Sequence, residues 1–250
     1  MSHETDVQAQ FSTRVPLYDR RSAWILDTGI TGAMVEAAQT HGDETLLDVC
    51  CGTGAVGAAF AGKVRRRVGV DLTPAMLDAA RPRLDEVVQG DVRALPFPDA
   101  SFDLVVSRQA VHFLPDPGVG IAEMGRVLRP GGRLVLGQRV PYGEADEAWM
   151  RELNYLKQPN LQTFILESHL REGMARAGVT GVTARDVTLW EDITDWVTSP
   201  EVPEPNRARI LAHCRTAPDA VRAVHPIEVD GENVRCCWRW VVLTGTKAAG

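Results

Sequence analysis

The chain has 250 residues, of which 44% are hydrophobic, and a formal net charge of −6. This length allows one α/β domain with a full core, and the charge excludes a global basic field for nucleic acid. The acidic, polar start lacks the basic and apolar blocks expected of a signal peptide, and no apolar stretch approaches the ~18 residues of a membrane span. Five cysteines without C-x-x-C spacing predict buried thiols in a reducing cytoplasm, without disulfides or a metal site.

The N-terminal half of the chain predicts alternating helices and strands. Apolar residues recur at helical spacing between residues 17 and 39, which predicts one or two helices. Thr73 with Pro74, and Asp116 with Pro117, are typical of helix starts. In chain order we then expect strand 45–49, helix 54–63, strand 68–70, helix 74–84, strand 86–89, strand 102–107, helix 117–128, a turn at 129–132 and strand 133–138.

Beyond residue 140 the alternation is looser. The pattern predicts helices 144–157 and 167–177, strand 180–189, a proline-interrupted helical stretch 191–212 and a very apolar strand 234–244. A turn at Asp230-Gly231 favours antiparallel pairing of the last strand with strand 180–189. The expected fold class is therefore α/β, a Rossmann-like three-layer sandwich whose mostly parallel seven-stranded sheet has an antiparallel last strand.

The segment 46–57 carries the strongest functional signal. An apolar strand ends near Asp48, a loop of small residues follows, and the next strand ends at Asp71. The glycines at 52, 54 and 57 match G-x-G-x-x-G, which favours a dinucleotide site and hence an NAD-dependent dehydrogenase. A glycine turn that serves only strand–helix packing is a second interpretation. Asp48 argues for a third, because a carboxylate there would repel a pyrophosphate but would accept a sulfonium cation or a zwitterionic amino acid.

Four ordered motifs extend this third interpretation. They read LLDVCCGTG at 46–54, GVDLTPAML at 69–77, GDVRALPFPDASFDLV at 90–105 and EMGRVLRPGGRL at 123–134. Together they resemble the class I S-adenosylmethionine-dependent methyltransferases, and within them the metal-independent small-molecule group that includes the ubiquinone/menaquinone C-methyltransferases. The resemblance covers about residues 40–138. It implies one methyltransferase domain over residues 1–250, with a helical cap at about 10–40, a cofactor-binding core at about 41–138 and substrate-side elements at about 139–250.

The resemblance also implies S-adenosyl-L-methionine as cofactor, with S-adenosyl-L-homocysteine as product. In the family's pattern, Asp48 and the loop after it face the methionine end, Asp71 accepts from both ribose hydroxyls, and Asp91 binds the adenine amino group. The expected cofactor-binding residues are Tyr18, Asp48, Cys50, Gly52, Thr53, Gly54, Asp71, Leu72, Met76, Asp91, Val92 and Ser107. Cys50 replaces the usual glycine, so we expect weaker or shifted binding and a space-filling side chain rather than a reactive thiol.

Methyl transfer is an in-line displacement that needs alignment of the acceptor and exclusion of water. A base is needed only for a hydroxyl or an acidic carbon, and His112 is the first candidate, with simple packing as the alternative. Arg108 is expected either to pair with an acidic acceptor or to lie in solvent.

Tyr142, Trp149 and Tyr155 fall after the fifth strand, where this family often covers its acceptor, and they are expected either to line that site or to pack in the core. The expected partner is a small-molecule acceptor, without nucleic acid or a membrane, and a homodimer stays open. A protein of this fold with a binding or non-methylating role is the remaining alternative.

Overall fold

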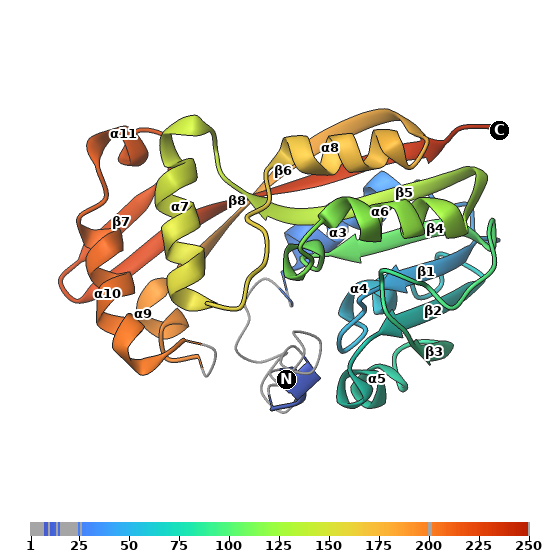
Figure 1. The fold of residues 1–250 in the computed structure, drawn as a ribbon, viewed down its shortest axis with the longest axis horizontal. Coiled ribbons are helices and arrows are strands. Elements are labelled where there is room, and N and C mark those ends of the chain that lie inside the picture. Colours follow the sequence, from blue (N-terminus) through green and yellow to red (C-terminus); the bar gives the residue numbers. More distant parts are fainter. Residues whose placement is uncertain are drawn as a thin grey trace.

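The structure is a computed structural model that describes residues 8, 9, 11–13, 15, 25, 27–199 and 202–249. Its centre is one mixed sheet with strand order β3-β2-β1-β4-β5-β8-β6, in which β7 also pairs with β8 (Figure 1). The strands are β1 Thr45–Val49, β2 Arg66–Asp71, β3 Glu86–Gln89, β4 Phe102–Arg108, β5 Leu128–Val140, β6 Val179–Asp192, β7 Ile227–Asp230 and β8 Asn233–Lys247. No helix in this part of the chain is long and apolar enough to cross a membrane.

Helices cover both faces of the sheet (Figure 1). The helices named in this article are α3 Thr28–Ala38, α4 Ala55–Ala58, α5 Pro74–Ala80, α6 Pro117–Val127, α7 Glu144–Lys157, α8 Glu167–Arg176, α9 Ile193–Trp196, α10 Glu204–Arg215, α11 Asp219–Arg222 and the 3₁₀ helix η1 Val111–Phe113. Strands β1 to β5 pair in parallel, whereas β8 runs antiparallel to β5, β6 and β7. The Rossmann-like fold class and its antiparallel last strand are thereby confirmed.

Several predicted elements have the expected bounds. Strands β1 and β3 and helix α7 begin and end where the sequence places them. Asp116 caps α6 as predicted, because its side chain accepts from the Gly118 amide at 2.8 Å. Thr73 does occupy the N-cap position of α5, but its side chain makes no capping hydrogen bond.

Two predicted helices end early. Past Ala58, the amides of Ala59, Phe60 and Ala61 bond to carbonyls three residues back, so α4 gives way to tight turns. Helix α5 ends at Ala80 rather than near residue 84, because Pro82 lacks an amide hydrogen and restricts the residue before it.

The C-terminal strands differ most from the prediction. Strand β5 begins at Leu128, so the expected turn at 129–132 lies within it as an irregularity in its pairing with β4. Residues 191–192 belong to β6, and α9 and α10 replace the predicted helical stretch. The partner across the turn after Asp230 is the short strand β7, which the sequence analysis missed, and the sheet therefore has eight strands instead of seven.

The long strands β6 and β8 join two hydrophobic clusters. One cluster lies on the parallel strands and includes Leu47, Val105 and Leu136. Another gathers α7, α9, α10 and α11 around Trp238 and Trp240 of β8, at the left of Figure 1. Strand β8 pairs with β5 only from Arg239 onward, and its earlier residues continue beside β6 and β7 beneath these helices.

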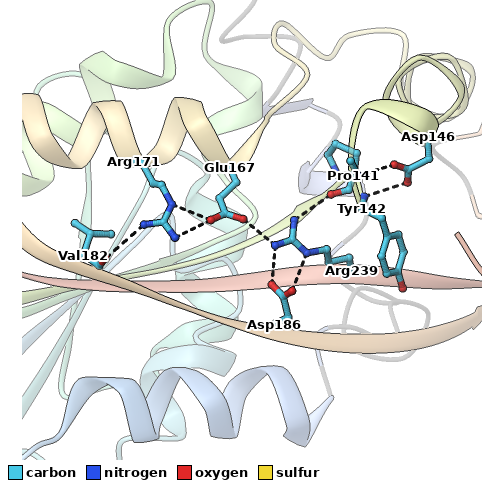
Figure 2. A network of polar contacts seen from close by, with 9 residues as sticks. Pro141, Tyr142, Asp146, Glu167, Arg171, Val182, Asp186 and Arg239 are labelled. Atoms are coloured by element: carbon cyan, nitrogen blue, oxygen red, sulfur yellow. Dashed lines mark hydrogen bonds and ion pairs between the residues drawn. The ribbon is translucent and has the colours of Figure 1, made fainter. Parts of the chain in front are cut away.

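A polar network lies where β8 passes from one hydrophobic cluster to the other (Figure 2). Arg239 of β8 donates to Glu167 of α8 at 2.8 Å, to both carboxylate oxygens of Asp186 of β6, and to the Pro141 carbonyl at 3.1 Å. Arg171 donates to the other oxygen of Glu167 at 2.8 Å. One guanidinium therefore ties together β6, β8, α8 and the residue that follows β5.

Candidate active site

A cleft of about 860 Å³, part of which is open solvent, lies at the carboxyl ends of β1, β2, β3 and β4. Open α/β sheets bind ligands at this edge. We call it the main cleft, and its lining residues come from the loops after these strands and from residue 11: Phe11, Cys50, Gly52, Asp71, Leu72, Thr73, Met76, Gly90, Asp91, Val92, Arg93, Arg108, Gln109, Ala110, Phe113, Leu114 and Pro115.

Asp71 occupies the end of β2 in this cleft. One carboxylate oxygen accepts from the Gly52 amide and the other from the Thr73 amide, both at 2.9 Å. The carboxylate therefore bridges the glycine loop to the start of α5. Burial raises the pKa of Asp71, although the amide hydrogen bonds oppose this shift. Each oxygen retains a lone pair for a further donor such as a hydroxyl.

A smaller space, the loop pocket, lies beside the main cleft and shares Cys50, Gly52 and Arg108 with it. Asp48 and Thr53 also line it. Asp48 is 1% exposed, and burial raises its pKa to about 7, although the Gly57 amide at 2.8 Å and the Arg108 charge lower it. Arg108 is itself buried, so the expectation that it lies in solvent is wrong.

Gly57 explains the third glycine of the loop motif. A Cβ atom at this position would lie 2.6 Å from Leu84 Cδ2 and 3.1 Å from Asp48 Oδ2. The glycine therefore lets α4 approach β1 closely enough to hydrogen-bond Asp48. This packing role accounts for the third position of G-x-G-x-x-G without any pyrophosphate.

Cys50 adopts a left-handed backbone conformation, with φ +56°. This conformation costs a non-glycine residue roughly 1–2 kcal/mol, which is the physical reason why glycine suits the position. Burial and the carboxylates of Asp71, Asp48 and Asp91 raise the pKa of the thiol well above its usual 9.0. A neutral thiol is a poor nucleophile, which favours the space-filling interpretation.

Asp91 has a partner that the sequence analysis did not anticipate. The Arg93 guanidinium donates to both oxygens of Asp91, and the Arg93 amide donates to one of them at 2.8 Å. This pairing lowers the pKa of Asp91. The carboxylate therefore stays ionised, and a ligand amino group would share it with Arg93.

A third space, the polar pocket, lies beyond η1. It is lined by Gln109, His112, Gln138, Arg139, Asn154, Gln158, Leu161, Thr163, Phe164 and Ile165. His112 is 7% exposed and lines this pocket, whereas its neighbour Phe113 lines the main cleft. Helix η1 therefore separates the two spaces, and Gln109 lines both.

The predicted cofactor-binding residues fall into clear groups. The main cleft is lined by Cys50, Gly52, Asp71, Leu72, Met76, Asp91 and Val92, and the loop pocket by Asp48, Cys50, Gly52 and Thr53. Gly54 and Ser107 line neither space, and Ser107 donates to the Val49 carbonyl at 2.9 Å. Tyr18 lies outside the described residues.

The other candidates lie away from these three spaces. Tyr142 donates to the Cys237 carbonyl, Trp149 stacks on His213, and Tyr155 is exposed. Residues 109–115, the segment after β4, were missed apart from His112, although ligand-binding loops are expected at a strand's carboxyl end. No signal in the sequence pointed to Phe11. Within the described ranges, no three His, Cys, Asp or Glu side chains are grouped to hold a metal ion.

Comparison with known proteins identifies the family. The model of the methyltransferase domain family matches residues 47–136. The chain is 32% identical over 205 residues to the 27-O-demethylrifamycin SV methyltransferase of Amycolatopsis mediterranei, and the match covers 76% of this chain and 73% of that protein. The chain belongs to the S-adenosylmethionine-dependent methyltransferases. This confirms the resemblance and the enzyme class, and S-adenosylmethionine is the cofactor of the family.

Other methyltransferases are similar over different lengths. The demethylmenaquinone methyltransferase of Deinococcus radiodurans is 38% identical over 145 residues, which cover 52% of this chain and 58% of that protein. The crystal structure of YcgJ from Bacillus subtilis superposes with a TM-score of 0.81 at 24% identity, covering 90% of this chain and all of YcgJ. That likeness supports the methyltransferase fold. None of these comparisons supports the dehydrogenase alternative.

Proposed function

We propose that this protein transfers the methyl group of S-adenosylmethionine to a small molecule, with the cofactor in the main cleft and the loop pocket. The observation that carries this proposal is the position of Asp71, which bridges the glycine loop and α5 inside the main cleft and still has lone pairs to offer. The family's pattern places the ribose hydroxyls at this residue. We further propose that the chain acts as one methyltransferase unit.

The charges of the two spaces suit this cofactor. Asp48, Asp71 and Asp91 all line them, and carboxylates accept from hydroxyl, amino and ammonium groups. A dinucleotide would bring its pyrophosphate close to the same three carboxylates, which would repel it. When bound, S-adenosylmethionine supplies an electrophilic methyl group on a sulfonium.

The chain's own residues would then orient the reactants and exclude water. Leu72 and Met76 give the main cleft an apolar wall, and Phe113 and Leu114 close it on the side of η1. Asp48 and Arg108 set the charge around the loop pocket. Holding two reactants in near-attack geometry contributes up to ~7–11 kcal/mol to a displacement, so the proposed catalysis is mainly proximity and orientation, without a metal.

The methyl acceptor that we propose is a small molecule. Relatives are named for demethylmenaquinone, 27-O-demethylrifamycin SV and malonyl-[acyl-carrier protein]. These names differ from one another, so they support the broad class only. The polar pocket beyond η1, next to the main cleft at Gln109, is the site that we propose for the acceptor.

The first test is the Asp71→Ala variant. Loss of a charged acceptor for two hydroxyl donors should weaken binding of S-adenosylhomocysteine at least ~10-fold, measured by calorimetry. Asp85→Ala is the matched control, because Asp85 is an exposed residue just before β3 and pairs with Arg67. Unchanged affinity in Asp71→Ala, with the fold intact by circular dichroism, would contradict the assignment.

A second test concerns His112. If His112 acts as a base on an acceptor in the polar pocket, His112→Ala should lower kcat at least ~100-fold. The affinity for S-adenosylhomocysteine should stay unchanged, because His112 does not line the main cleft. Turnover is followed as release of labelled methyl product. Full activity in the variant would restrict His112 to packing.

A further inference from the structure

Gln109, the first residue after β4, holds an unusual backbone conformation. Its φ of +53° is left-handed, and its backbone amide donates to the Gly137 carbonyl at 2.9 Å. Few residues other than glycine adopt this conformation, because it costs them stability. Within the described ranges, Cys50 is the other such residue that lines the main cleft. Strained residues of this kind gather at ligand-binding sites.

The side-chain amide of Gln109 has a fixed orientation. Its Oε1 accepts from the Arg139 backbone amide at 3.0 Å and from Nε2 of the buried Gln138 at 2.9 Å. A backbone amide can only donate, so the oxygen of the side chain, and not its nitrogen, faces Arg139. No acceptor among the residues that the structure describes takes a hydrogen from Gln109 Nε2. Gln109 therefore holds two unused donors in a set position.

Gln109 lies where the proposed methyl donor and its acceptor would meet. It lines the main cleft, which we assign to the cofactor, and it also lines the polar pocket. The candidate base His112 lines the polar pocket as well. Methyl transfer requires the reacting atom of the acceptor to be held against the methyl group. That atom would therefore lie at the boundary of the two spaces, close to Gln109.

The size of the polar pocket limits what can enter it. Its free volume is about 20 Å³, which is room for one or two water molecules. It can therefore admit a single polar group of an acceptor, such as a hydroxyl or a carbonyl oxygen, while the rest of the acceptor stays outside. An apolar group of the same size would leave the donors of Gln109 without a partner, which is costly in a partly buried site.

We infer that Gln109 selects methyl acceptors that carry an oxygen at or next to the methylated atom, and that its Nε2 donates to this oxygen. The inference rests on the proposed function, which makes the main cleft the methyl-donor site. A site that hydrogen-bonds one group of its substrate discriminates against analogues that lack this group. The acceptor class is therefore that of alcohols, phenols and ketones, and not that of protonated amines, which have no lone pair to accept with.

The test uses cyclohexanone and methylenecyclohexane, which have the same shape and differ in the oxygen. Their affinities for the full chain saturated with S-adenosylhomocysteine are measured by NMR titration. Gln109→Glu keeps an oxygen for the Arg139 amide but replaces the donor, so it should lower the ratio of the two affinities, ketone over hydrocarbon, at least ~5-fold.

Gln39→Glu is the matched control. Gln39 is also left-handed, with φ +47°, and its Oε1 accepts from Arg133 Nη1 at 2.6 Å. It lines neither the main cleft nor the polar pocket. The ratio of the two affinities should therefore stay within ~2-fold of its value in the unmodified protein.

A second variant keeps the test decisive if Gln109→Glu does not fold. Gln109→Gly suits the left-handed backbone without strain and removes the donor, so it should lower the same ratio at least ~5-fold. An unchanged ratio in the Gln109 variants, an equal fall in Gln39→Glu, or no binding of cyclohexanone to the unmodified protein would each overturn the inference. Failure of the unmodified protein to bind S-adenosylhomocysteine would instead overturn the proposed function.

Discussion

Asp48 is the residue whose ionisation bears most directly on the proposed donor site. Burial raises its pKa to about 7, so the carboxyl is largely neutral at pH 6 and largely ionised at pH 8. S-adenosylmethionine carries a permanent positive charge that S-adenosylhomocysteine lacks. A pair of opposite unit charges in a partly buried site is worth roughly 1–4 kcal/mol, so ionisation of Asp48 should favour the charged cofactor.

We therefore expect the ratio of the two affinities, S-adenosylmethionine over S-adenosylhomocysteine, to rise at least ~5-fold between pH 6 and pH 8. Calorimetric titration of both ligands at each pH measures it. Asp48→Asn should flatten the dependence, because the amide still accepts from the Gly57 amide but does not ionise. A ratio independent of pH in the unmodified protein would show that this carboxyl does not act on the sulfonium.

For individual residues, the sequence predicted many members of the candidate site but not the side chains with which they pair. The end of a buried strand and the motif spacing were enough to bring Cys50, Gly52 and Asp71 to one cleft. The pairing of Arg93 with Asp91 depends on a tight turn that places two nearby side chains together. The burial of Arg139 depends on Asn154 of α7 and on Trp238 of β8, which lie far from it along the chain, and no local pattern encodes those contacts.

At the scale of elements, the Arg239 network holds the junction together (Figure 2). Arg239→Met leaves Glu167, Asp186 and the Pro141 carbonyl without their shared donor. Since Asp186 is 55% exposed, water recovers part of the loss, and we expect the free energy of unfolding to fall by about 1–3 kcal/mol in urea denaturation. Arg176→Met, which breaks an exposed pair on α8, should change it by less than about 0.5 kcal/mol.

The same network predicts how the free energy of unfolding changes at acidic pH. The two arginines hold the pKa of Glu167 below its ordinary value of 4.5. A carboxyl whose pKa is lowered in the folded state stabilises the protein at pH values above the pKa of the unfolded state. This stabilisation is lost as the pH falls through the folded-state pKa. The difference in unfolding free energy between the native chain and Arg239→Met should therefore shrink below pH 4.5. A difference that stayed constant would assign the stabilisation to packing of the Arg239 side chain.

Element boundaries show where local patterns succeed. Strands β1 and β3 and helix α7 were predicted with their true ends, because capping and apolar periodicity decide them locally. Strand β7 was missed because its four residues, mostly exposed, carry little pattern and pair only with the long β8. Strand β6 extends past its predicted end because β8 provides a partner along its whole length.

At the scale of the whole molecule, the fold class followed from the alternation of strands and helices, while the arrangement of the last hundred residues did not. Their helices pack around Trp238 and Trp240, which lie on a strand far away in sequence. Contacts between distant segments are set by the sheet and not by neighbouring residues. This explains why the donor site was more predictable than the polar pocket.

The uninterrupted run of β8 has a consequence for how new activities could arise. Strands β6 and β8 run from one hydrophobic cluster to the other, so the helices around Trp238 and Trp240 rest on the same sheet as the main cleft but outside the strands that border it. Side chains around the proposed acceptor site can therefore be exchanged while the geometry of the proposed donor site is preserved. We expect that variants with different methyl acceptors can be obtained by changing residues around Trp238 and Trp240 while the cofactor-binding strands stay the same.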